Sequence, residues 1–207
     1  YFLNSVVVTV ATVSIILVVS FMAAYVIVRS RTAFSSRIFS LFLLGIAIPI
    51  QATIVPVYYL IVQIGLYDTL WALILPSAAF AIPISVLILT NFLRDVPREL
   101  FESMKVDGAT DWQMLWRLAA PMCRPALVTV AIYDALNVWN GFLFPLVLTQ
   151  SADNRVLPLS LWSFQGAFSA NTPAILAAVV LSALPLIVAY AFGRRQMVAG
   201  LTAGVGK

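Results

Sequence analysis

The sequence predicts an all-α protein that crosses a membrane several times. Its 207 residues are 62% hydrophobic and only 10% charged, whereas a soluble domain carries about 25% charged residues. Its apolar runs are also long: no charged residue occurs from Tyr1 to Val28, from Ile38 to Tyr67, or from Thr69 to Leu93. A membrane helix needs about 20 such residues. Composition and run length together therefore exclude an ordinary soluble domain.

We expect one membrane domain over residues 1–207 with about five spans. The predicted spans lie at about 4–28, 38–63, 69–93, 121–149 and 172–193. Strands are excluded because the runs do not alternate in character as barrel strands do, and an open sheet would leave backbone groups unpaired in lipid. Prolines kink helices; the second span contains Pro49 and Pro56, the third Pro76 and Pro83, and the fifth Pro185.

The basic residues predict the orientation of the chain. Eleven of the twelve lie in alternate connections, namely after the first span, after the third span and in the C-terminal tail. Cytoplasmic loops collect Lys and Arg, so we expect these regions, including the C-terminus, to be cytoplasmic and Tyr1 to lie outside. The chain has no histidine and a single cysteine, Cys123, so neither a metal site nor an internal disulfide is predicted.

Two segments outside the predicted spans stand out. The external one, 151–171, places Trp162, Phe164 and Phe168 among polar residues. It is expected either as an amphipathic helix at the interface, where aromatic residues are enriched, or as a lip of a translocation path. The cytoplasmic one, 94–120, is the most highly charged part of the chain, so a partner protein is expected to bind there.

The cytoplasmic segment predicts a pair of short helices. Pro97 suits the first turn of a helix, and an amphipathic pattern follows that ends at Gly108, where a left-handed residue can stop a helix. Thr110 and Gln113 have the spacing of a capping box for the second helix. From these patterns alone, the pair could anchor the loop at the membrane or dock a cytoplasmic protein.

Resemblance to a known family favours docking. The run 102–109 (ESMKVDGA) resembles the EAA loop of ABC importer permeases, with Pro121 at the family's distance after Gly108. Ser103, Met104 and Ala120 depart from the usual residues of that motif. Asn4-Ser5, Trp139-Asn140 and the tail 200–207 resemble the carbohydrate branch, maltose-type and MalG-like, which usually has one more span before Asn4.

The resemblance implies a type I ABC importer transmembrane domain with a cytoplasmic coupling helix pair. It implies a permease subunit of the inner membrane that forms half of the translocation path for a sugar or oligosaccharide. The implied partners are an ATP-binding-cassette ATPase dimer, a second and non-identical permease, and an extracytoplasmic solute-binding protein. ATP would be bound by the ATPase, so no cofactor and no enzymatic activity are expected of this chain.

The resemblance also implies which residues couple the chain to the ATPase. Phe101 and Met104 would supply apolar contact, Glu102 a charge partner, and Asp107 and Gly108 the tight turn. The expected coupling set is Leu100, Phe101, Glu102, Met104, Asp107, Gly108 and Ala109.

Polar residues in the fourth span are candidates for the translocation path. A carboxylate within a span usually faces a cavity or a partner, so Asp134 could line the path or bind a structural neighbour. Asn137, Trp139 and Asn140 follow it. An aromatic ring and amides suit sugar hydroxyls, but hydrogen bonding between helices explains the same residues.

Other classes of protein remain as alternatives. A permease for glycerol phosphate, an amino acid or a polyamine would show the same coupling motif. An ion-coupled secondary transporter uses ionisable groups inside its spans, and Asp134 is the only one here. An intramembrane enzyme is disfavoured because the spans carry no HExxH motif or Ser–His arrangement.

Overall fold

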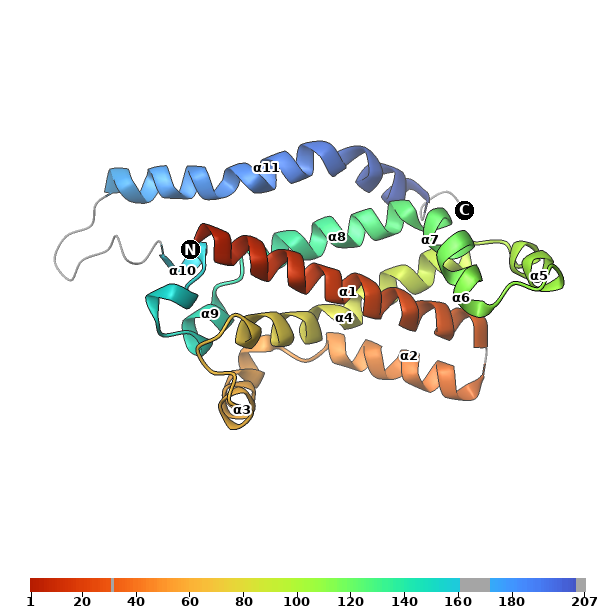
Figure 1. The fold of residues 1–207 in the computed structure, drawn as a ribbon, viewed down its shortest axis with the longest axis horizontal. Helices are drawn as coiled ribbons and strands as arrows, with labels where there is room; N and C mark the ends of the chain where they lie inside the picture. The colour runs from red at the N-terminus through yellow and green to blue at the C-terminus, as the bar shows by residue number, and fades with distance from the viewer. Residues whose placement is uncertain (31, 161–171, 204–207) are drawn as a thin grey trace. The chain divides into compact units, whose positions relative to one another are not determined.

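The computed structural model describes residues 1–30, 32–160 and 172–203, and every regular element in these ranges is a helix (Figure 1). The longer helices are α1 (Phe2–Ser30), α2 (Ala33–Ile46), α3 (Ile50–Gln63), α4 (Trp71–Arg94), α8 (Arg124–Trp139) and α11 (Thr172–Ala203). The shorter ones are α5 (Arg98–Val106), α6 (Asp111–Met114), the π-helix η1 (Leu115–Ala119), α7 (Ala120–Met122), α9 (Leu143–Leu148), the 3₁₀-helix η2 (Ala152–Asn154) and α10 (Leu157–Ser160). The predicted all-α class is confirmed.

Two of the expected spans are broken in the structure. The helix expected over 38–63 is two helices, because Pro49 caps the start of α3 with an extended backbone at ψ 129°, and the residue before a proline avoids the helical region. The span expected over 121–149 is interrupted at Cys123, where the helix axis bends by 76°, and again after Trp139. The prolines at 56 and 185 lie inside α3 and α11.

Length and composition identify the helices that can cross a bilayer. Within the described residues, α1 and α4 each qualify alone, and the broken pairs α2–α3 and 111–122 with α8 would add two more if each counts as one span. The final helix α11 contains the apolar stretch Ile175–Pro185. The expected total of five spans stays a prediction. Trp162, Phe164 and Phe168 of the predicted external segment lie outside the described residues.

The chain folds into two compact units. Unit 1 consists of residues 1–15, 48–80 and 132–192, and unit 2 of residues 16–47, 81–131 and 193–207. Buried side chains at the centre of unit 1 are Val8, Ile61, Ala72, Leu73, Ile74, Phe144, Leu148 and Val156. Each unit thus has its own apolar core, and the candidate sites described below each lie within one unit.

The core of unit 2 joins the coupling segment to the long helices. It includes Phe21 and Tyr25 of α1, Leu89 and Leu93 of α4, and Ala126 and Val130 of α8, together with Phe101, Met114, Leu115 and Ala119 of the predicted coupling segment. Small residues permit close approach within the unit: a Cβ on Gly45 of α2 would lie 3.1 Å from Pro83 Cγ of α4. Helices packed in lipid commonly use such small residues at their contacts.

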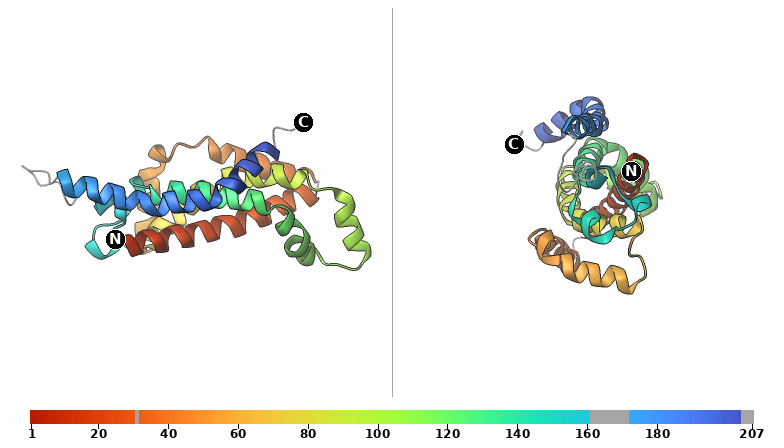
Figure 2. Two further views of the ribbon diagram at one scale, coloured as in Figure 1. Left: turned by 90° about the horizontal axis from the view of Figure 1, so that it is seen from above. Right: turned by 90° about the vertical axis from the view of Figure 1, so that its left-hand side faces the viewer.

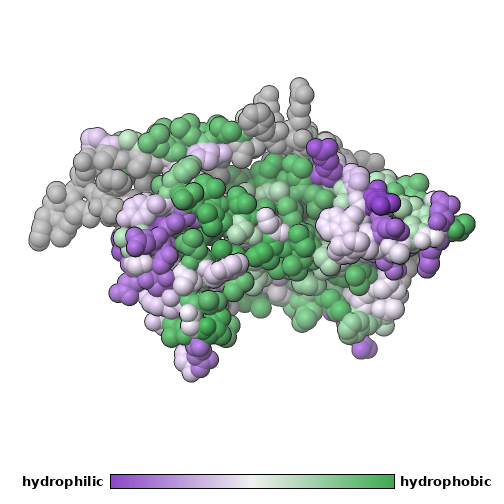
Figure 3. All heavy atoms as spheres, viewed as in Figure 1, coloured by the Kyte–Doolittle hydropathy of each residue, from purple (hydrophilic) through white to green (hydrophobic). Residues whose placement is uncertain are grey.

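The helix α5 projects past the C-terminal end of α1 in both of two perpendicular views, and α6 lies beside that end (Figures 1 and 2). Hydrophilic residues gather over this part of unit 2 (Figure 3). The segment predicted from charge density to be a protein surface is therefore a distinct, polar projection of the unit.

Candidate coupling site

The first coupling helix, α5, ends at the glycine that its sequence predicts. Gly108 adopts φ +81°, and the N–H of Ala109 donates to the carbonyl of Met104 at 2.9 Å. This geometry closes the last turn of a helix with a left-handed residue, which glycine adopts without steric cost. The predicted stop at Gly108 is confirmed.

The second helix begins at the predicted capping box. The Thr110 N–H donates to Gln113 Oε1 at 2.8 Å, and the Gln113 N–H donates to Thr110 Oγ1 at 3.3 Å. The helix then widens into a π-helical turn at Leu115–Ala119, just before Pro121. Sequence periodicity gives no sign of this wider turn, and such turns occur frequently at functional sites.

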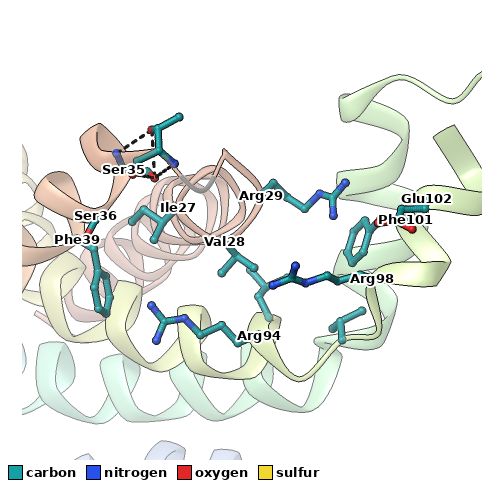
Figure 4. A pocket seen from close by; sticks show the side chains of 13 residues that line it. Ile27, Val28, Arg29, Ser35, Ser36, Phe39, Arg94, Arg98, Phe101 and Glu102 are labelled. Atoms are coloured by element: carbon teal, nitrogen blue, oxygen red, sulfur yellow. Dashed lines mark hydrogen bonds between the residues drawn. The ribbon is translucent and has the colours of Figure 1, made fainter.

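Both coupling helices are anchored on one face of α1. Phe21, Tyr25 and Arg29 recur every four residues, so their side chains lie in a row along the helix. The Phe101 ring of α5 lies 6.2 Å from the Tyr25 ring and 4.5 Å from the Arg29 guanidinium carbon, as Figure 4 shows for the Arg29 pair. The Trp116 ring lies 6.3 Å from Phe21. Both short helices are therefore in direct contact with α1.

Phe101 and Met104, which were expected to supply apolar contact to the ATPase, both pack within unit 2. Phe101 is only 3% exposed, and Met104 packs against the same core. An aromatic ring buried against Tyr25 and Arg29 cannot also contact another protein without leaving its site. Phe101 is therefore covered by its own chain, whereas Met104 is only partly buried.

The outer face of α5 carries a different set of residues. Leu100 is 38% exposed and Val106 is 87% exposed, whereas Glu102 and Asp107 are exposed and charged. Ala109 is half-buried beside the turn. Val106 was not among the expected contact residues. The sequence does contain a sign that could have identified Val106, because it is an isolated apolar residue on the charged face of an amphipathic helix.

The candidate path residues do not converge on one site. Asp134 is 1% exposed within unit 1. Trp139 is buried, donates from Nε1 to the Ser182 carbonyl at 3.1 Å, and packs edge-on against Phe2 at 5.7 Å.

The two candidate asparagines are exposed, Asn137 on α8 and Asn140 directly after its last residue. Each bonds to its own helix: Asn137 Nδ2 donates to the Tyr133 carbonyl and Asn140 Nδ2 to the Leu136 carbonyl, both at 2.8 Å. Trp139 lies about 200° around the helix from Asn137, at about 100° per residue, so one sugar ring cannot contact both.

A polar clamp in unit 1 was not anticipated. Asp68, with φ 58°, accepts hydrogen bonds on Oδ1 from the N–H groups of Gln150 (2.8 Å) and Ser151 (3.0 Å), and its own N–H donates to the Leu148 carbonyl. Asn154 Nδ2 donates to the Asp68 carbonyl. One residue thus ties the connection before α4 to the segment 148–154.

The same region is held from the start of α1. Asn4 Nδ2 donates to the carbonyls of Asp153 and Arg155, and Ser5 Oγ accepts from the Leu157 N–H at 2.8 Å. The pair Asn4-Ser5, which contributed to the family resemblance, therefore positions the chain that leads into α10. The link joins residues about 150 positions apart, so no local pattern could reveal it.

The Asp68 clamp predicts a pH-dependent loss of order. The backbone N–H of Gln150, followed by that of Ser151, lowers the pKa of the Asp68 carboxyl. A lowered native pKa means that the carboxylate stabilises the fold above the unfolded value of about 3.9, and that this contribution is lost as pH falls through the native pKa. We expect Asp68→Asn to increase proteolysis of residues 148–157 at neutral pH. We also expect the variant to lack the further increase in proteolysis that protonation of Asp68 causes in the native protein at low pH.

The matched control for that variant is Asp153→Asn, which removes the same charge from an exposed position in the clamped segment. Proteolysis of the purified protein in detergent, followed by mass spectrometry, measures the effect. Equal cleavage of the two variants would show that the Asp68 hydrogen bonds do not hold the segment.

Comparison with known proteins identifies the family. Residues 16–197 match the family described as the binding-protein-dependent transport system inner membrane component. The chain belongs to this family. It is 42% identical over 207 residues to an ABC transporter permease protein, ORF2, of Caldicellulosiruptor sp., covering 100% of this chain and 75% of the relative. The permease is thus an integral inner-membrane subunit of an ABC importer, as its motif predicted.

Further relatives are named for sugars. The permease is 32% identical to a diacetylchitobiose uptake system permease of Streptomyces coelicolor, covering 99% of this chain and 68% of the relative. It is 33% identical to a trehalose transport system permease of Mycobacterium tuberculosis, covering 99% and 76%. Among solved structures it resembles the MetNI methionine ABC transporter, with a TM-score of 0.72 at 19% identity over 95% of this chain and 93% of that chain. That likeness confirms the fold.

Proposed function

We propose that the permease forms half of the translocation path for a sugar or oligosaccharide and receives its energy from a separate ATPase dimer. The sugar specificity is supported by the relatives, which are named for diacetylchitobiose, trehalose and arabinooligosaccharides. The partners of this proposal are an extracytoplasmic binding protein and a second, non-identical permease. The permease itself carries no ATPase site, and its C-terminus is cytoplasmic.

The observation that carries the coupling proposal is the two-sided character of α5. One side of the helix is fixed to α1 through Phe101, and the rest of its surface exposes Leu100, Glu102 and Val106. A rigid element that is gripped on one side and anchored on the other passes on the movement of its partner. Closure of the ATPase dimer would therefore displace α5 and, through the row on α1, the spanning helices.

The turn at 107–109 sets the angle between the two coupling helices. Gly108 supplies the left-handed residue, and Asp107 and Ala109 flank it. Phe101 and Trp116 contact the same face of α1. The angle between the two coupling helices therefore determines how a force on α5 is divided between these two contacts with α1. The residues of the turn thus act by geometry and not by direct chemistry.

For the path, we propose that Asn137 and Asn140 face the translocated sugar. Both amides are exposed, and each retains one N–H and its carbonyl oxygen for a ligand after bonding its own helix. Asp134 and Trp139 are proposed to hold α8 in place from its buried side. Weak, replaceable amide contacts suit a path that must release its solute.

Uptake into proteoliposomes tests this function. The permease is reconstituted with the ATPase and second permease that copurify with it, and labelled disaccharides are supplied with the binding protein. We expect uptake only when ATP is present on the side of the ATPase, and no loss of uptake when ion gradients are collapsed. Unlabelled oligosaccharides should compete, whereas glycerol phosphate, amino acids and polyamines should not.

Two results would overturn the proposal. Uptake that needs an ion gradient and not ATP would make the protein a secondary transporter. If only an amino acid or a polyamine competed, the assignment as an ATP-driven importer would stand, but the assignment of a sugar as its solute would be wrong.

A further inference from the structure

A basic cavity of about 700 Å³ lies in unit 2 where α1, α2, α4 and α5 meet (Figure 4). Ligand sites commonly have volumes of about 300–1,000 Å³. Three arginines line the cavity, Arg29, Arg94 and Arg98, against one carboxylate, Glu102. The charged lining therefore carries a net +2, from three positive charges and one negative, which favours an anion.

Aromatic rings hold two of the three arginines in place. Arg29 stacks on Phe101, and the Arg94 guanidinium carbon lies 5.2 Å from the centre of the Phe39 ring. Among the residues that the structure describes, none of the three forms a salt bridge, and the Arg29 Nε is buried without a hydrogen-bond partner. Contacts with aromatic rings orient a guanidinium but leave its in-plane N–H groups available to an anion.

The opposite wall of the cavity is formed by the start of a helix. Thr32, Ser35 and Ser36 line it at the N-terminal end of α2. The Thr32 and Ser35 side chains form a capping box, with the Ser35 N–H donating to Thr32 Oγ1 at 3.2 Å. The partial positive charge at a helix N-terminus adds to the field of the arginines. The Thr32 hydroxyl donates to Ser35 Oγ and the Ser35 hydroxyl to the Thr32 carbonyl, so the guanidinium groups are the donors that this cavity offers to phosphate oxygens.

The position of the cavity favours a lipid over a soluble anion. It lies at the ends of α1 and α4, each of which is long and apolar enough to span the bilayer, and its lining continues into apolar residues, including Ile27, Val28 and Leu93. A soluble anion needs no such apolar wall, whereas a phospholipid places its phosphate among basic groups and its chains along apolar ones. Basic pockets between spanning helices are known to take anionic headgroups.

We propose that this cavity binds the phosphate group of an anionic phospholipid in the leaflet that faces the ATPase. The assignment of that leaflet rests on the proposed coupling function. Arg98 and Glu102 belong to α5, and Arg29 contacts Phe101, the anchor of α5. Occupancy by lipid therefore fixes the position of the coupling helix relative to α1.

The test counts lipids that remain bound to the purified permease complex. The complex is placed in phosphatidylcholine nanodiscs that contain a minority of phosphatidylglycerol, and bound lipids are counted by native mass spectrometry. We expect selective retention of phosphatidylglycerol and a loss of about 30-fold in R94Q/R98Q, since each basic residue near an anionic surface contributes about 1 kcal/mol. The control R117Q/R124Q removes the same charge from exposed arginines that do not line the cavity.

The other outcomes overturn the proposal. Equal losses in the two double variants would indicate general attraction to a charged surface. Displacement of the lipid by inorganic phosphate would assign the cavity to a soluble anion. Absence of phosphatidylglycerol whenever the ATPase is bound, with its return on removal of the ATPase, would assign the cavity to that protein interface. Because the readout is lipid occupancy and not transport, a negative result leaves the coupling proposal to stand or fall on its own test.

Discussion

Gly108→Val is expected to abolish most transport while leaving the permease inserted in the membrane. At φ +81° a residue with a Cβ is strained by about 1–2 kcal/mol, and a β-branched side chain is among the least suited. A Cβ at this position would have no neighbouring heavy atom within 4 Å, so the turn is free to relax and redirect α5. A strain of about 1.4 kcal/mol favours the redirected turn by about tenfold, and uptake should fall by a similar factor.

Two controls separate this effect from general strain. Gly108→Asn should retain most uptake, because asparagine tolerates the left-handed region. Gly65→Val imposes comparable strain at φ +73°, also with no heavy atom within 4 Å of a Cβ, but outside the coupling pair. We expect binding-protein-stimulated ATP hydrolysis to remain linked to uptake in Gly65→Val. Normal uptake by Gly108→Val would show that the angle of this turn does not matter.

Phe101→Ala is expected to separate ATP hydrolysis from transport. The substitution removes the ring that contacts Tyr25 and Arg29, and a buried Phe→Ala change costs about 3–5 kcal/mol at its site. The exposed face of α5 remains, so the ATPase should still bind and hydrolyse ATP. Uptake per ATP should fall about tenfold or more, because α5 then moves without carrying α1 with it.

The neighbouring residue provides a control with a different expected pattern. Leu100 is exposed on the same helix, so Leu100→Ala should weaken ATPase binding and lower hydrolysis and uptake together. Phe101→Leu, which keeps an apolar side chain but loses the ring, should be intermediate. Parallel loss of hydrolysis and uptake in Phe101→Ala would mean that Phe101 contacts the ATPase after all, and thermal unfolding of each variant checks that the fold survives.

The local features of the coupling pair were predictable from sequence because short stretches determine them. A left-handed glycine ends α5 and a capping box starts α6, and both depend on residues within about one turn. The burial of Phe101 was not predictable in the same way. Periodicity identifies the apolar face of a helix, but it does not say whether that face is covered by the same chain or by a partner.

Features that depend on distant residues or on backbone detail were missed. The Asp68 clamp joins positions more than 80 residues apart, and its only sign in the sequence is one carboxylate in an otherwise uncharged region. The break before Pro49 was expected only as a kink. In the fourth span, helical geometry places Asn137 and Trp139 on different faces of the helix, which their closeness in sequence does not show.

Whether the outer face of α5 docks the ATPase can be decided by measuring how well the ATPase protects position 106 from a thiol reagent. With Cys123 replaced by serine, Val106→Cys provides a single thiol at a position that is 87% exposed on α5, and Arg37→Cys provides an exposed control on α2. We expect a maleimide to label both thiols in the permease alone, and binding of the ATPase to protect the thiol at 106 but not the one at 37. Equal labelling of the thiol at 106 with and without the ATPase would show that α5 is not the docking helix.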